Sequence, residues 1–171
     1  MDGAVVLEIG AGAGAVHLAL LEAGAATAID VDASQDYLSA AHSEAERRGL
    51  ANRVEYRYGD AVELAGDLHS YDVVILDAVI CCYPYLSALL EAAVRPGPRL
   101  VGLTYPHEAW WLRAAMHLSN AVSAVRRRPD RWFIHRHAEI DKLMGEADLS
   151  KRYRGGARWW RVAVYGTQQV V

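Results

Sequence analysis

Short apolar runs alternate with longer amphipathic segments over the first two thirds of the chain. Each run is followed by turn-forming or acidic residues, and the apolar positions within a run are continuous. Such runs are typical of strands that are buried on both faces, and the segments between them have the period of helices. The pattern therefore predicts a parallel sheet covered by helices on both faces. The expected strands are Ala4–Ile9, Thr27–Asp32, Val54–Tyr58, Asp72–Asp77 and Arg99–Thr104.

Helices are expected between these strands. Gly14–Ala23 is rich in Ala and Leu and is followed by Gly24, a residue typical of helix ends. A second helix is expected to begin after Ser34, whose hydroxyl can cap it, and to run to Arg48. A third covers about Tyr85–Val94 and ends at a segment rich in Pro and Gly.

The last third of the chain departs from this alternation. Its periodicity predicts a helix over Glu108–Arg128 and another over Ala138–Ala147. The first of these carries one apolar stripe, made of Trp111, Ala115, Leu118, Val122 and Val125. Two short strands, Lys151–Arg154 and Trp160–Tyr165, are expected to form a hairpin around Gly155-Gly156.

A glycine-rich segment follows the first expected strand. The sequence Glu8-Ile9-Gly10-Ala11-Gly12-Ala13-Gly14 reads as the end of a strand, a tight turn and the start of a helix. Its spacing is Gly-x-Gly-x-Gly, and not the Gly-x-Gly-x-x-Gly expected where a helix receives a pyrophosphate. The Glu8 carboxylate would repel a pyrophosphate, but it suits a cationic, amine-bearing ligand. The segment therefore favours a nucleoside cofactor without phosphate over a nicotinamide or flavin cofactor.

Two acids close the second expected strand, in Ile29-Asp30-Val31-Asp32. An acid about twenty residues after such a turn is placed to accept hydrogen bonds from both hydroxyls of a ribose. Asp30 and Asp32 both qualify by position. Together with the glycine turn, they predict a pocket for an adenosine-containing cofactor.

The chain resembles the class I S-adenosylmethionine-dependent methyltransferases. The similar segments are VLEIGAGAG, AIDVDAS, Gly49–Ala61 with its Gly-Asp pair, and Tyr71–Asp77, in the order of the family. The resemblance implies a single domain over residues 1–171, with a Rossmann-like α/β fold. Its seven-stranded sheet would be mostly parallel, with an antiparallel C-terminal hairpin strand and helices on both faces. Members of the family carry helices before the first strand that cap the cofactor. Here we expect an unusually short protein or a sequence without its start.

The resemblance also implies a binding site for S-adenosylmethionine. Glu8 would hold the amine end through water, and Asp32 would take the ribose hydroxyls, a role for which Asp30 competes. The remaining contacts would come from the turn (Gly10, Ala11, Gly12), from residues flanking the adenine (Asp60, Ala61) and from the mouth of the fourth strand (Asp77, Ala78). Asp60 and Asp77 have an alternative reading as turn or cap carboxylates. His17 is expected to be a packing or surface residue.

The acceptor is expected outside the carboxyl ends of the fourth and fifth strands. Leu76–Pro84 resembles magnesium-protoporphyrin O-methyltransferases, as do a helical insertion over about 106–137 and Phe133-Ile134-His135. In those enzymes a histidine precedes the Tyr-Pro pair, where this chain has Cys82. We therefore predict His107 as general base and Tyr83 as a catalytic or pocket-lining residue. The alternatives are a helix N-terminal residue for His107 and a core residue for Tyr83.

Charge is distributed unevenly along the chain. Residues 1–94 hold four Lys/Arg against fifteen Asp/Glu, and residues 95–171 hold fourteen against six. An anionic partner of the basic half would explain the asymmetry, and so would a solvated surface with arginines at helix ends. Trp110, Trp111 and Trp132 lie near the arginines of this half. Because aromatic and basic residues together grip anionic rings, we predict an anionic small acceptor there.

Composition adds a few exclusions. No apolar run reaches the roughly eighteen residues of a membrane span. The adjacent Cys81 and Cys82 cannot join distant segments, so a reducing, cytoplasmic setting is expected. No His/Cys cluster has the spacing of a zinc site, and no metal is predicted.

The sequence thus predicts an S-adenosylmethionine-dependent methyltransferase that acts on a small, anionic acceptor, with O-methylation favoured. An RNA methyltransferase is an alternative, since the basic half could bind phosphates. No Asn/Asp-Pro-Pro-Tyr segment or appended RNA-binding domain supports it, so nucleic acid is not the expected partner. A non-catalytic cofactor-binding domain or fragment is a further alternative. A nicotinamide-dependent oxidoreductase is opposed by the glycine spacing, by Glu8 and by the terminal hairpin.

Overall fold

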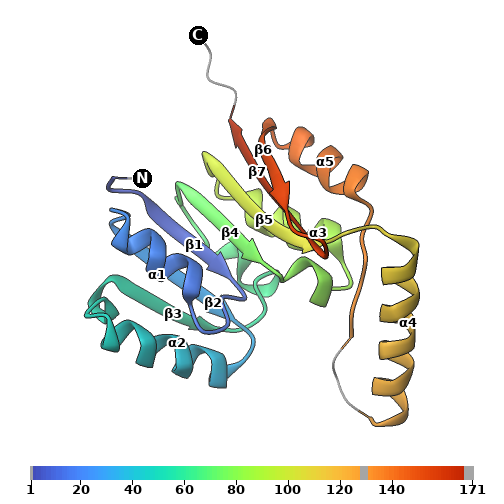
Figure 1. Cartoon of the computed structure of the whole chain (residues 1–171). Helices are drawn as coiled ribbons and strands as arrows, with labels where there is room; N and C mark the ends of the chain where they lie inside the picture. Colours follow the sequence, from blue (N-terminus) through green and yellow to red (C-terminus); the bar gives the residue numbers. More distant parts are fainter. Residues whose placement is uncertain (1, 128–130, 168–171) are drawn as a thin grey trace.

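A seven-stranded sheet runs through the centre of the computed structural model, which describes residues 2–127 and 131–167 (Figure 1). The strand order is β3-β2-β1-β4-β5-β7-β6. Neighbouring strands are parallel from β3 to β5, and β7 pairs antiparallel with both β5 and β6. The fold class predicted from the sequence is confirmed. The strands are β1 (Val5–Ile9), β2 (Thr27–Asp32), β3 (Val54–Tyr58), β4 (Val73–Asp77), β5 (Leu100–Pro106), β6 (Leu149–Gly156) and β7 (Trp160–Thr167).

Helices cover both faces of this sheet. Residues of α1 and α2 pack in one apolar cluster, and residues of α3 and α5 pack in the other. The Ser34 hydroxyl accepts a hydrogen bond from the backbone N–H of Tyr37, at 3.3 Å, and so caps α2 as predicted. The helices are α1 (Ala15–Glu22), α2 (Gln35–Arg47), α3 (Leu86–Val94), α4 (Trp110–Val125) and α5 (His137–Glu146).

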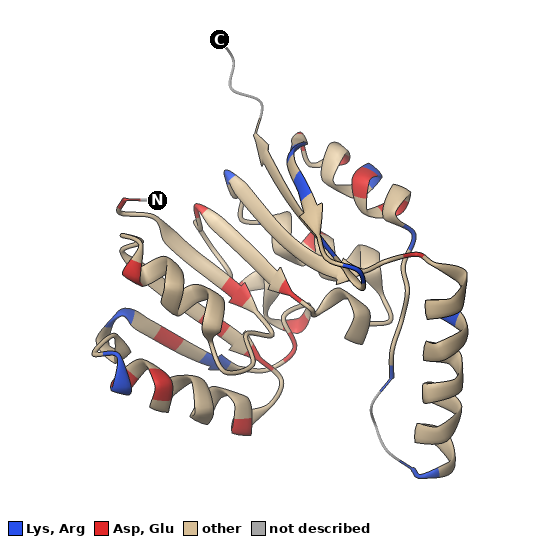
Figure 2. Cartoon of the chain, viewed as in Figure 1, with Lys and Arg blue, Asp and Glu red and all other residues tan. Residues whose placement is uncertain are grey.

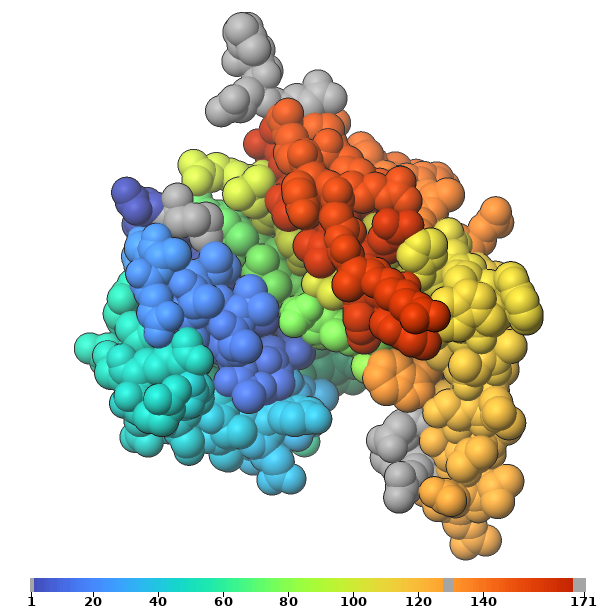
Figure 3. All heavy atoms as spheres, in the orientation of Figure 1, coloured from blue at the N-terminus to red at the C-terminus, as the bar shows by residue number. Residues whose placement is uncertain are grey.

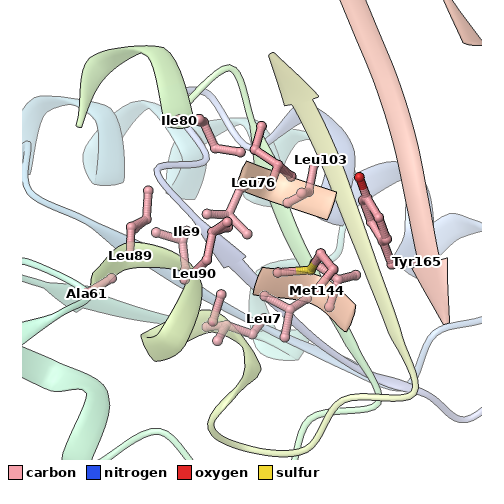
Figure 4. Close-up of a cluster of buried hydrophobic side chains, with 14 of the residues drawn as sticks. Leu7, Ile9, Ala61, Leu76, Ile80, Leu89, Leu90, Leu103, Met144 and Tyr165 are labelled. Atoms are coloured by element: carbon pink, nitrogen blue, oxygen red, sulfur yellow. The ribbon is translucent and has the colours of Figure 1, made fainter. Parts of the chain in front are cut away.

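The central strand β1 contributes residues to both apolar clusters. Val6 and Leu7 are fully buried and belong to different clusters, because successive side chains of a strand point to opposite faces. Figure 4 shows Leu7 among the residues of the larger cluster, which includes Leu90 of α3 and Met144 of α5. Burial of such a leucine stabilises the fold by about 1.5–3 kcal/mol. Strand order reverses between β1 and β4, and this is where open α/β sheets bind ligands.

The turn of the C-terminal hairpin lies later than predicted. Gly155 and Gly156 belong to β6, and the turn is closed by a hydrogen bond from the Ala157 N–H to the Trp160 carbonyl, at 3.0 Å. Gly156 has a φ of 137°, and a Cβ there would collide with the Trp160 carbonyl. The glycine therefore permits a close approach of the two strands and does not form the turn itself.

Helix α4 projects away from the sheet beyond the end of β5 (Figures 1 and 3). Its predicted apolar stripe is largely exposed, with Leu118 at 68%, Val122 at 42% and Val125 at 85% of full exposure. Leu112 is the buried residue of this helix. The periodicity of the sequence predicted this helix correctly. It did not indicate whether another element covers the apolar stripe. Within the described ranges, no helix combines the length and apolar character needed to cross a membrane.

Candidate active site

A cavity of about 510 Å³ opens at the carboxyl ends of β1, β2 and β4, a size typical of small-molecule sites. Figure 2 shows acidic residues at the arrowheads of β1 and β4, on this edge of the sheet. Most of the predicted cofactor residues line the cavity, namely Gly10, Gly12, Asp32, Asp60, Ala61, Asp77 and Ala78. Several other lining residues were not predicted as cofactor contacts, among them Ser34, Tyr37 and Gly59.

The glycine turn exposes its backbone to this cavity. Gly10, Gly12 and Gly14 have φ values of 66°, 56° and 77°, in the left-handed region that favours glycine. A Cβ on Gly10 would lie 2.6 Å from a methyl carbon of Val79, whereas one on Gly12 would meet nothing within 4 Å. Any side chain at Gly10 would therefore collide with the loop after β4, and the turn stays open to a ligand at Gly12.

Asp32 is fixed between the glycine turn and α2. One carboxylate oxygen, Oδ1, accepts a hydrogen bond from the Ser34 N–H at 2.8 Å, and Oδ2 accepts one from the Gly12 N–H at 3.2 Å. The side chain is 8% exposed and borders the cavity. Asp32 thus presents a pre-oriented carboxylate to a ligand with hydroxyl groups.

Asp30 lies away from the cavity, so the alternative in which Asp30 binds the ribose hydroxyls is not supported. The residue is fully buried and does not border the cavity. Within the described part of the chain neither of its carboxyl oxygens has a hydrogen-bond partner. Burial raises the pKa of Asp30 to about 7, while His17 opposes the shift. Asp30 and Asp32 lie on the same face of β2, but Asp30 is two residues further from the carboxyl end of the strand, so its carboxyl group lies inside the protein and not at the cavity.

Asp60 and Tyr83 meet across the cavity wall. The Tyr83 hydroxyl donates to Asp60 Oδ2 at 2.9 Å, and the Val62 N–H donates to Asp60 Oδ1 at 2.8 Å. Burial and the Asp60 carboxylate raise the pKa of Tyr83 to about 12. The phenol therefore remains protonated at neutral pH. Its role in catalysis stays a prediction.

The backbone is strained where β4 enters the cavity. Ala78 has a φ of 58°, a region that residues other than glycine seldom adopt. Its carbonyl contacts the Cys81 sulfur at 3.1 Å, and its N–H donates to the Thr104 carbonyl at 3.3 Å. Such strain clusters at ligand-binding sites, and Ala78 borders the cavity as predicted.

A second cavity, of about 310 Å³, lies between α4 and the segment 131–135. The segment is held on one side by Asn120, whose amide bonds both the N–H and the carbonyl of Trp132 at 2.8 Å. On the other side it is held by the loop after β4: the Phe133 N–H donates to the Cys81 carbonyl at 2.7 Å, and the His135 ring bonds the Tyr83 carbonyl at 2.8 Å. This second cavity is lined by Arg113, Met116, His117, Asn120, Trp132, Phe133, Ile134 and His135.

His107 does not border the cavity at the glycine turn. The ring atom Nε2 of His107 contacts the guanidinium of Arg161, which can only donate. The backbone N–H of His107 donates to the Trp159 carbonyl at 3.0 Å. Burial and the Arg161 charge lower the pKa of His107. The ring is therefore neutral, with its acceptor nitrogen occupied. The assignment of His107 as general base stays a prediction.

Replacement of His107 by alanine tests that assignment. A general base contributes roughly a hundredfold or more to turnover, so a base at this position requires a loss of that size in His107→Ala. Single-turnover methyl transfer should be measured at saturating cofactor, with thermal unfolding as a check on the fold. A turnover within about threefold of wild type would reduce His107 to a structural contact of Arg161.

Comparison with known proteins places the chain in a family. The sequence profile described as "Methyltransferase domain" matches residues 6–96, which hold the glycine turn, Asp32 and Asp60. The chain belongs to the methyltransferase family. A ribosomal protein L11 methyltransferase from Xanthomonas campestris pv. campestris (strain 8004) is 30% identical over 155 residues, covering 90% of this chain and 45% of that protein. The chain thus spans less than half the length of this curated relative.

Solved structures show the same architecture in other methyltransferases. Magnesium protoporphyrin IX methyltransferase from Synechocystis PCC 6803, with bound SAH, has a TM-score of 0.78 at 22% identity, covering 98% of this chain and 75% of that one. An O-methyltransferase family protein from Burkholderia thailandensis has a TM-score of 0.79 at 15% identity, covering 98% and 52%. This methyltransferase therefore has the class I fold.

Proposed function

We propose that this methyltransferase binds S-adenosylmethionine in the cavity at the glycine turn and transfers its methyl group to an oxygen of a small, anionic acceptor. The observation that carries the proposal is the Asp32 carboxylate, held by two backbone N–H groups beside an uncovered glycine backbone. A ribose needs an acceptor for its two hydroxyls, and the rest of a nucleoside needs close backbone approach.

The residues at the cavity fit the parts of this cofactor. Gly10 and Gly12 would contact its methionine and ribose parts through the backbone, and Asp32 would accept hydrogen bonds from the ribose hydroxyls. Asp60 and Ala61 would flank the adenine. Glu8 is almost fully buried behind the turn and is not among the residues that border the cavity, so it would hold the amine through water. None of the described residues that line this cavity is a Lys or Arg that could pair with a pyrophosphate, in keeping with the Gly-x-Gly-x-Gly spacing.

The chemistry of the rim favours an acceptor that is already an anion. Bound cofactor supplies an electrophilic methyl group on a sulfonium, so the protein has mainly to align the acceptor. Tyr83 borders the cavity as a protonated phenol, whereas the neighbouring Cys81 is fully buried and does not border it. Because this phenol is already protonated at neutral pH, it cannot act as a general base toward the acceptor. A carboxylate needs no proton removed and suits this rim.

The groove at α4, defined by the lining of the second cavity, supports the anionic character of the acceptor. It combines the guanidinium of Arg113 and the ring of His117 with the aromatic side chains of Trp132 and Phe133, and no Asp or Glu is among its lining residues. Arg113 also pairs with Glu108, outside this lining, at 3.3 Å, so an anionic acceptor would share or replace that partner. The Cys81–Tyr83 segment borders the cofactor cavity and also holds the groove's inner wall. An acceptor lying in the groove would thus be next to the cofactor. Guanidinium and aromatic groups together bind planar carboxylates well.

A protein acceptor is the second candidate. The curated relative that aligns with 90% of this chain is named for methylation of a ribosomal protein. Helix α4 would then contribute an exposed docking face and not a small-molecule groove.

An acceptor screen with methyl-labelled S-adenosylmethionine separates the two candidates. We expect label in base-labile esters of planar aromatic carboxylic acids, and none in purified ribosomal protein L11. Arg113→Met should lower kcat/KM for those acids about tenfold or more, since it removes a charge-assisted contact. Arg99→Met is the matched control, because this exposed arginine pairs with Asp72 away from both cavities. Label in the protein alone, or equal effects of both variants, would contradict the proposal.

A further inference from the structure

A buried histidine lies directly behind the glycine turn. His17 belongs to α1 and is fully buried, and its partner Glu8, in β1, is 1% exposed. The Glu8 oxygen Oε2 is 2.8 Å from the backbone nitrogen of His17 and 2.7 Å from its Nδ1. Because a carboxylate only accepts, the Nδ1 atom of this pair carries the proton. Both hydrogen bonds fall on Oε2, which leaves Oε1 for another donor.

The same ring also supports the turn. A Cβ on Gly14 would lie 2.7 Å from Cε1 and 3.0 Å from Nε2 of His17. Glycine at position 14 thus lets the backbone rest directly on the imidazole. The ring therefore sets both the orientation of the Glu8 carboxylate and the position of the turn in front of it.

Packing alone does not account for this histidine. Its Nε2 is buried without a hydrogen-bond partner in the described part of the chain, although an apolar residue would fill the space without that penalty. The neighbouring positions Leu18 and Leu21 are apolar and fill the core below it. What distinguishes position 17 from them is the Nδ1 donor, and that donor has one partner, the Glu8 carboxylate.

We propose that His17 is a positioning residue, which holds the Glu8 carboxylate in the orientation from which it would hold the ammonium group of the cofactor through water. The proposal rests on the proposed function, since it needs S-adenosylmethionine in the cavity. It assigns His17 to the amino-acid end of the ligand, whereas Asp32 serves the nucleoside end. The hydrogen bond from the ring to Glu8 thus matters only for ligands that carry the ammonium group, whereas the contact of the ring with Gly14 is packing that an apolar side chain of similar size also provides.

Two ligands and two variants test this division. S-adenosylhomocysteine carries the amino-acid end, and 5′-methylthioadenosine lacks it but keeps the nucleoside. In His17→Leu, which fills the space without a donor, we expect calorimetry to show S-adenosylhomocysteine affinity reduced about tenfold. Affinity for 5′-methylthioadenosine should stay within twofold of wild type. His17→Asn, whose amide can donate to Oε2, should restore most of the lost affinity.

Each outcome decides the proposal. Unchanged binding of S-adenosylhomocysteine in a folded His17→Leu variant would overturn it, as would an equal loss for both ligands, which indicates a purely structural ring. If His17→Leu does not fold, as judged by its thermal unfolding, His17→Asn decides by the same ratio of the two affinities. Wild-type affinities for both ligands support the proposal. An equal loss of affinity for both ligands overturns it. Failure of the wild-type protein to bind either compound would refute the proposed function itself.

Discussion

Replacement of Asp32 by alanine is expected to weaken binding of S-adenosylmethionine more than tenfold. The change removes the carboxylate that the Gly12 and Ser34 N–H groups hold at the cavity, and with it the two charge-assisted hydrogen bonds that we propose it accepts from the ribose. Calorimetric titration with S-adenosylhomocysteine, which is not consumed, measures the effect directly. In contrast to the His17 variants, affinity for 5′-methylthioadenosine should fall by the same factor, because the nucleoside end is shared.

Asp36→Ala is the matched control for charge. Asp36 lies in the exposed first turn of α2, so its loss changes the net charge equally without touching the carboxylate at the cavity. We expect its affinity to stay within twofold of wild type. Wild-type affinity in a folded Asp32→Ala protein would refute the ribose assignment and, with it, the location of the cofactor.

Replacement of Asp30 by asparagine is expected to stabilise the protein above neutral pH. The pKa of this carboxyl group is raised from 3.8 to about 7 in the folded state, mainly by burial, with Glu8 and Asp32 adding to the shift and His17 opposing it. Because the pKa of Asp30 is higher in the folded state, the contribution of this carboxyl group to stability is fully present below its pKa in the unfolded chain. That contribution is lost as the pH rises through the folded-state pKa of about 7. Asparagine has the same shape and does not ionise. At pH 8 the free energy of unfolding should rise by about 2–4 kcal/mol, and at pH 4 it should change little.

Chemical denaturation at a series of pH values measures this difference. The increase in the free energy of unfolding of Asp30→Asn over wild type should grow between pH 4 and pH 7 and level off above pH 7. Asp67→Asn, at an exposed carboxylate, should show a flat difference near zero. A flat difference for Asp30→Asn as well would mean that the buried group does not titrate in this range.

The sheet could be predicted from the sequence because each strand is a local pattern. Thr27–Asp32 and Val54–Tyr58 were placed to the residue, since both are short segments rich in β-branched or aromatic residues, and Ala33-Ser34 and Gly59-Asp60 mark where they end. The glycine turn and Asp32 were predictable for a similar reason. Left-handed φ angles at Gly10 and Gly12 require glycine, and the carboxyl end of β2 is fixed by the strand itself.

The other features of the site, and the exposure of α4, depend on contacts between distant segments that no local sequence pattern encodes. The interaction of His17 with Glu8 joins a helix to a strand, and a lone histidine among Ala, Val and Leu gives no sign of its partner. Tyr37 reaches the cavity because α2 begins beside it, although the tyrosine itself is exposed. The periodicity of α4 predicts its apolar stripe without predicting that the stripe faces solvent.

The place of β7 in the sheet has a consequence for biosynthesis. Its residues follow those of the other six strands of this sheet in the chain, yet it lies between β5 and β6, and Leu100 pairs with Gly166. While the ribosome adds the residues from Pro106 to Trp160, the outer side of β5 carries unpaired N–H and C=O groups. A nascent chain in that state can pair with another through β5, so slow translation of this stretch would increase co-translational aggregation.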